Sequence, residues 1–163
     1  MQRKPKPLQI GESLPKQLLV EGNDDFHALC QIFEANQLPN QFGIKEKNGY
    51  PKLIETLDVE LDAYGLQALG IIVDADENFQ ARWQSLRNRL IEFQYFDTPV
   101  EPSLNGTIVY PTNPTRPIIG IWIMPNNQLP GILENFIAYL IPNRESNPSW
   151  QYAVQCVAGI PDD

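Results

Sequence analysis

Four acidic residues lie at or near the ends of short apolar segments, and their spacing is suited to holding a divalent cation. Glu21 ends one such segment, and Asp74 and Asp76 flank a single alanine directly after another. Side chains two residues apart on an extended chain point to the same side, so Asp74 and Asp76 can converge on one ion. Asp25 follows Glu21 by about one helical turn and is a candidate outer ligand. Mg²⁺ or Mn²⁺ is the expected ion, because hard cations prefer carboxylate oxygens.

The segments that position these acids alternate between two apolar patterns. Runs of consecutive apolar residues predict buried strands over Leu18–Glu21, Phe42–Lys47, Ala68–Val73 and Ile118–Met124. Apolar residues at helical spacing predict helices over Pro51–Tyr64, Phe79–Phe93, Pro130–Leu140 and Trp150–Val157. A further helix is expected after the first strand, with Asn23 or Asp24 as its N-cap.

The segment Asp97–Pro117 interrupts the alternation of strands and helices. It holds many of the 15 prolines of the chain and the turn signals Asn105-Gly106 and Asn113-Pro114. We expect an insertion before the last core strand, with a hairpin around Gly106 whose second strand is Thr107–Tyr110.

The order of the elements predicts the α/β fold class. Strands that are apolar on both faces and alternate with helices indicate a mostly parallel sheet with helices on both faces. The 163 residues suit one domain over 1–163, with its core at about 18–141. Sites in such sheets lie beyond the carboxyl ends of the strands. If their strands are neighbours, Glu21, Asp74 and Asp76 share one small volume, and like charges that close favour a bound cation.

The composition restricts the partners that the chain can take. Its formal net charge is −8 and its pI is about 4.6, which makes it a poor bulk binder of nucleic acid. Cys30 and Cys156 fall in apolar helical patterns and predict buried thiols in a reducing compartment. No apolar stretch is long enough to cross a membrane, and the basic start lacks the apolar run of a signal peptide. We therefore expect a cytoplasmic protein.

Two motifs of the chain resemble those of the TOPRIM family. Leu-Leu-Val-Glu-Gly-Asn-Asp-Asp, ending at Asp25, is similar to the first TOPRIM motif, and Ile-Ile-Val-Asp-Ala-Asp, ending at Asp76, is similar to the second. The resemblance implies a TOPRIM/Rossmann-like fold in which Asp74 and Asp76 hold Mg²⁺. It also implies that Glu21 acts as general acid or base or helps to hold the metal, and that Asp25 joins the metal site as in the OLD-type nucleases.

A third segment resembles a particular group of TOPRIM-related proteins. The stretch from Gly120 to Phe136 resembles the bacterial TOPRIM-related proteins of the DUF3226 type. Asn126 follows the last core strand, where a carboxylate would complete a three-acid cluster, and Glu134 is a minor candidate for the site.

Basic residues near the acidic motifs are candidates for contacting nucleic acid. Lys45 and Lys47 lie in the second expected strand, and Arg82 and Trp83 lie on the helix after Asp76. A tryptophan there can stack on a base. The plainer interpretations are a solvated helix face for Arg82 and a core position for Trp83.

These observations predict a Mg²⁺-dependent, nuclease-like phosphodiester hydrolase, and two other functions remain open. A haloacid-dehalogenase-like phosphatase also begins with Asp-x-Asp after an apolar strand, but it needs Thr or Val where this chain has Asn78. The second alternative is a catalytically weak or inactive TOPRIM-like module. Such a module would bind an ATPase or another protein partner, or form a homo-oligomer.

Overall fold

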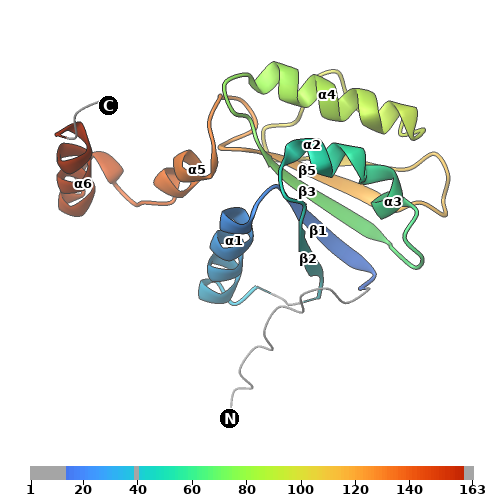
Figure 1. Cartoon of the computed structure of the whole chain (residues 1–163), viewed down its shortest axis with the longest axis horizontal. Coiled ribbons are helices and arrows are strands. Elements are labelled where there is room, and N and C mark those ends of the chain that lie inside the picture. Colours follow the sequence, from blue (N-terminus) through green and yellow to red (C-terminus); the bar gives the residue numbers. More distant parts are fainter. Residues whose placement is uncertain (1–13, 39–40, 160–163) are drawn as a thin grey trace, which may run out of the picture.

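The fold is built on a mostly parallel sheet, seen in a computed structural model that describes residues 14–38 and 41–159. Within these residues the sheet has five strands in the order β2-β1-β3-β5-β4 (Figure 1). Four strands are parallel, namely β1 (Lys16–Val20), β2 (Gly43–Glu46), β3 (Ala68–Asp74) and β5 (Ile118–Met124). The edge strand β4 (Thr107–Val109) runs antiparallel to β5.

Helices connect the parallel strands, as the alternation of patterns predicts. They are α1 (Asn23–Ala35), α2 (Tyr50–Glu55), α3 (Leu57–Leu61), α4 (Phe79–Glu92) and α5 (Leu133–Tyr139). A short 3₁₀ helix, η1 (Arg144–Ser146), leads into α6 (Pro148–Ala158). The predicted α/β class is confirmed, and the arrangement is consistent with a Rossmann-like or TOPRIM-like fold.

The two faces of the sheet are covered unequally (Figure 1). On one face, alternate residues of β1, β3 and β5 pack with α2, α3 and α4 in a large buried cluster that includes Leu19, Ile71 and Ile121. On the other face, α1 packs over β1 and β2 in a smaller cluster around Val20, Leu29 and Ile44. Most of the apolar burial that stabilises the sheet is therefore on the first face.

Several predicted boundaries differ from the structure, and three of the differences concern how helices begin or break. The N-cap of α1 is Gly22, and Asn23 is already the first helical residue. The helix predicted over 51–64 is divided into α2 and α3 at Thr56, whose hydroxyl donates a 2.9 Å hydrogen bond to the Lys52 carbonyl. Such back-bonding competes with the helix ladder and bends helices. The helix predicted from residue 130 begins at Leu133.

The insertion folds differently from the predicted hairpin. Gly106 only precedes β4, and the strand that pairs with β4 is β5, with Val109 opposite Ile119. The chain reverses between them, where the Asn113 side chain accepts hydrogen bonds from the backbone and hydroxyl of Thr115. This Asx turn at Asn113-Pro114 is the second turn signal of the insertion and closes the hairpin.

Two further sequence predictions concern the helices, one about membrane spans and one about the cysteines. No helix in the described ranges has both the length and the apolar composition needed to cross a bilayer. The prediction of two buried thiols is wrong for Cys156, which is exposed on α6 because that helix lies apart from the sheet (Figure 1). Cys30, on α1, is half-buried against the smaller core cluster.

Candidate functional site

Parallel pairing of β1 and β3 brings the two acidic motifs together. Val20 lies opposite Ile72 in the register of these strands, so Glu21 is held beside the end of β3. The Asp74 backbone N–H donates a 2.8 Å hydrogen bond to Oε1 of Glu21. The predicted proximity of Glu21 and Asp74 therefore follows from adjacent strand ends.

Asp25 is held at the third position of α1, facing the same strand ends. Its Oδ2 accepts a 2.8 Å hydrogen bond from the Gly22 backbone N–H, which caps the helix. The residue is only 7% exposed. Burial raises the pKa of Asp25 against the effect of that hydrogen bond, and the charges of Asp24 and Glu134 raise it further.

Asp74 is the centre of the acidic cluster. Its Oδ1 is buried and accepts no hydrogen bond from the described residues. Burial, followed by the negative charges of Asp25, Glu21, Asp76 and Glu134, raises the pKa of Asp74 to about 7. An ionised Asp74 is therefore costly in this structure unless a cation is added.

Arg82 supplies one positive charge beside the cluster. Its guanidinium pairs with Asp76 and lies 3.6 Å from Oε1 of Glu21. It also stacks on the ring of Tyr50, 3.7 Å from the ring centroid. Burial still raises the pKa of Glu21, although the charge of Arg82 and the Asp74 N–H act in the opposite direction.

The backbone at Asp76 connects the acidic motif to the loop before α5. Asp76 has a φ of 52°, in the left-handed region that few residues other than glycine adopt. Two hydrogen bonds, of 3.0 and 2.8 Å, pair its backbone with that of Gly131. This bridge fixes the approach to α5 and explains how Glu134, in the first turn of that helix, acts on Asp74 and Asp25.

The carboxylates form a loose cluster. Within the described ranges, no group of three or more His, Cys, Asp or Glu side chains is arranged closely enough to hold a metal ion. The donor chemistry nevertheless suits Mg²⁺ or Mn²⁺, because the donors are carboxylate oxygens and one of them, Oδ1 of Asp74, has no partner. Asp76 is the most exposed of the four predicted metal ligands, since its side chain is 56% exposed.

A shallow hollow opens beside Arg82 and Asp76. It has a volume of about 550 Å³, and its lining also includes Tyr50, Asn78 and Ser85. The charged groups of the lining are the guanidinium of Arg82, which pairs with Asp76, and the carboxylate of Glu77.

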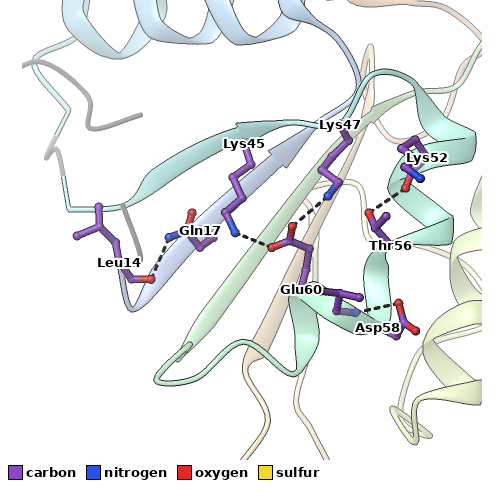
Figure 2. A network of polar contacts seen from close by, with 9 residues as sticks. Leu14, Gln17, Lys45, Lys47, Lys52, Thr56, Asp58 and Glu60 are labelled. Carbon is purple, nitrogen blue, oxygen red and sulfur yellow. Dashed lines mark hydrogen bonds and ion pairs between the residues drawn. The ribbon is translucent and has the colours of Figure 1, made fainter. Parts of the chain in front are cut away.

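Lys45 and Lys47, the other predicted nucleic-acid contacts, are paired within the protein. Both ammonium groups bind the carboxylate of Glu60 on α3, at 2.8 and 3.0 Å (Figure 2). Burial would raise the pKa of Glu60, but the hydrogen bonds and charges of the two lysines outweigh it, and the pKa is lowered. This network ties the end of β2 to α3, and neither lysine is among the residues that line the hollow beside Arg82.

Trp83 is a core residue. It is 1% exposed, and its indole N–H donates a 2.8 Å hydrogen bond to the Val100 carbonyl. The ring therefore has no open face on which a base can stack. Trp83 instead fastens the insertion to α4.

Two asparagine side chains shape the loop that follows β5 at this edge of the sheet. Asn126 accepts hydrogen bonds from the backbone N–H groups of Gln128 and Leu129. Buried Asn127 accepts one from Ile123. Both amides are therefore engaged in shaping the loop, and the carboxylate beside this third strand end is that of Asp74, which lies opposite Met124.

Two site residues have roles that the sequence patterns do not specify. Tyr50 supports Arg82 from the start of α2, and nothing in its spacing marks it. Arg82 is predicted as a phosphate contact, but its pairing with Asp76 and Glu21 depends on the way α4 leaves β3. An arginine six residues after an Asp-x-Asp motif is the one available signal.

The sheet order and the acidic cluster at the strand ends define an α/β protein with a carboxylate site at the edge where such folds bind ligands. A family model described as "Protein of unknown function (DUF3226)" matches residues 15–163. The chain belongs to this family. Searches of the curated proteins and of the solved structures found no match.

Proposed function

We propose that this protein is a metal-dependent, nuclease-like phosphodiester hydrolase of TOPRIM type. The observation that carries the proposal is the carboxylate of Asp74, which has a buried oxygen without a partner and lies in the field of four other acids. A divalent cation would neutralise this cluster. The resemblance of both motifs to TOPRIM and OLD-type nucleases supports the same conclusion.

Asp74, Glu21 and Asp25 are the residues that would hold Mg²⁺ or Mn²⁺, with Asp76 joining them when its side chain leaves Arg82. Bound there, the metal would supply Lewis-acid stabilisation of charge on a phosphate oxygen. Glu21 has a raised pKa and an anchoring hydrogen bond from the Asp74 backbone, so it is suited to holding and transferring a proton. Arg82 lines the neighbouring hollow and would orient the phosphate.

A regulatory, partner-binding module is the second candidate function, and it has an observation of its own. Arg82 already pairs with Asp76 and lies near Glu21, which gives the cluster an internal cation. In such a module the arginine would replace the metal, and the fold would present a binding surface without catalysis.

Metal binding and catalysis on the same samples test the two functions. Mn²⁺ and Mg²⁺ binding would be measured by calorimetry, and plasmid nicking by gel electrophoresis, for the wild type and for Asp74→Asn and Glu21→Gln. Glu46→Gln is the matched control, because Glu46 ends the neighbouring strand β2 and is exposed.

A hydrolase is expected to bind metal, to lose binding in Asp74→Asn and to lose nicking in both site variants, while Glu46→Gln retains both properties. Binding without nicking in the wild type would reject the hydrolase and retain the metal site. A wild type that shows neither metal binding nor nicking would reject both the hydrolase and the metal site, and would favour the regulatory module.

A further inference from the structure

Arg82 is a buried cation at a position where its own helix does not stabilise it. It is the fourth residue of α4, and no acidic residue lies in the first turn of that helix. The partial positive charge of a helix N-terminus disfavours a cation there. The side chain of Arg82 is nevertheless only 10% exposed. A buried cation must be paired, so groups from other parts of the chain hold this one in place.

Three side chains outside α4 contact the guanidinium of Arg82. It pairs with Asp76 and lies 3.6 Å from Oε1 of Glu21. Its Cζ lies over the ring of Tyr50, 3.7 Å from the ring centroid. A planar guanidinium can make both kinds of contact at once, because carboxylates bind in its plane and aromatic rings stack on its face. The ring of Tyr50 therefore favours the orientation in which the guanidinium meets both acids.

The turn before α2 fixes the position of Tyr50. The Lys47 backbone N–H donates a 3.0 Å hydrogen bond to the Val20 carbonyl, and the Gly49 N–H donates one of 2.7 Å to the Glu21 carbonyl. Gly49 has a φ of 103°, which glycine adopts without the strain that a side chain would add. The turn is thus attached to the end of β1, and Tyr50 follows it as the first residue of α2.

The contacts of Arg82 oppose metal binding in the acidic cluster. Among the residues that the structure describes, no three acids are grouped closely enough to hold a metal ion. The carboxylate of Asp76, a predicted ligand, is paired with Arg82 instead. A guanidinium at this place competes with a metal in two ways, because it occupies carboxylate oxygens and adds a positive charge.

We propose that Tyr50 is a positioning residue that holds Arg82 on Asp76 and Glu21, and that this stack keeps the acidic cluster closed to a divalent cation until the guanidinium leaves. The inference rests on the metal site of the proposed function and concerns the regulation of that site. The stack stabilises the closed state, so a chain without the ring releases Arg82 more readily. Because the ring face makes the contact, phenylalanine should replace Tyr50 and an aliphatic side chain should not.

NMR of the Arg82 side chain in metal-free protein tests the positioning role. Its guanidinium signals are assigned by their loss in Arg82→Met, and the rate of rotation about the Nε–Cζ bond is then measured. Rotation should be slow in the wild type and in Tyr50→Phe, and roughly tenfold faster in Tyr50→Leu, because a desolvated cation–π contact is lost. Tyr50→Met gives the same test if Tyr50→Leu does not fold, since methionine fills irregular core space.

Mn²⁺ binding by calorimetry on the same samples tests the effect on the cluster. Tyr50→Leu is expected to bind Mn²⁺ about twofold more tightly than the wild type. The double variant Tyr50→Leu/Arg82→Met should bind like Arg82→Met alone, because Tyr50 acts only through Arg82. Phe93→Leu is the control. It removes a stack of 4.6 Å on Arg89 of the same helix, whose guanidinium pairs with Glu92, and it should leave the affinity unchanged.

The outcomes separate this inference from the proposed function. Slow rotation of Arg82 in Tyr50→Leu, or fast rotation in Tyr50→Phe, would overturn the inference. Mn²⁺ binding that Tyr50→Leu leaves unchanged, or tightens equally without Arg82, would overturn the inference and retain the metal site. No binding in any variant, Arg82→Met included, would reject the metal site and the inference together. Binding in Tyr50→Leu and Arg82→Met but not in the wild type would support both.

Discussion

Two partly buried carboxylates, Glu60 on α3 and Asp74 at the end of β3, have their charges balanced in opposite ways. Glu60 forms ion pairs with two lysines, which lower its pKa despite its burial. Asp74 lies near four other acids and forms no ion pair with a described residue, and its pKa is raised to about 7. The comparison separates a charge network that is complete within the chain from one that requires a further positive charge. The first ties β2 to α3, and the second has the properties of a ligand site.

Removing Glu60 tests the structural cluster and should have the largest effect. Glu60→Gln leaves two partly buried ammonium groups without their carboxylate, and the free energy of unfolding should fall by roughly 2 kcal/mol. Glu55→Gln is the control, because its pair with Lys52 is exposed on both sides and should contribute less than about 0.5 kcal/mol. Urea unfolding measures both. Equal losses of unfolding free energy in Glu60→Gln and Glu55→Gln would contradict the distinction between a buried and an exposed ion pair.

Removing the charge of Asp74 should act in the opposite direction. Its folded-state pKa of about 7 lies above the ordinary value of 3.8, so the folded state binds more protons and stability falls as pH rises between these values. In metal-free protein above pH 7, Asp74→Asn should therefore increase stability, by on the order of 1 kcal/mol because solvent screens the site.

The pH profile sharpens this contrast. The lowered pKa of Glu60 contributes stability above its ordinary value of 4.5, and that stability is lost as pH falls through the folded-state pKa. Thermal unfolding across pH 3–8 should show the acid-side loss disappear in Glu60→Gln and the neutral-side loss disappear in Asp74→Asn. The reverse assignment would show that the two clusters have been interpreted wrongly.

Arg82 is the internal cation of the acidic cluster, and its removal should have a smaller effect. Arg82→Met should tighten Mn²⁺ binding about threefold, because a competing positive charge is lost, and should abolish any nicking that depends on phosphate orientation. Arg87→Met is the control on the same helix, where the guanidinium donates to the Pro99 carbonyl. Unchanged Mn²⁺ affinity would show that Arg82 does not compete with the metal.

Glu134 lies at the margin of the cluster, and the smallest effect is expected there. Among the four neighbouring acids, Glu134 raises the pKa of Asp74 least, and its side chain is exposed. Glu134→Gln should weaken Mn²⁺ binding about twofold, as measured by calorimetry. A loss as large as that of Asp74→Asn would make Glu134 a direct ligand.

The sequence by itself determined the α/β class and every parallel strand, and it placed Glu21 and Asp74 at strand ends, whereas their close approach depends on the pairing of β1 with β3. Consecutive apolar residues specify buried strands, and parallel strands must end at one edge. Propensity could not place the break at Thr56 or the pairing of β4 with β5, because both depend on hydrogen bonds that form only in the folded chain.

The tertiary structure alone decided which charges meet. Lys45 and Lys47 bind Glu60, which lies 15 and 13 positions further along the chain, and Arg82 binds Asp76, six positions before it. It also decided that Trp83 is buried. Residue types specify which groups can carry charge or apolar surface, whereas the packing of distant elements determines whether each group finds its partner.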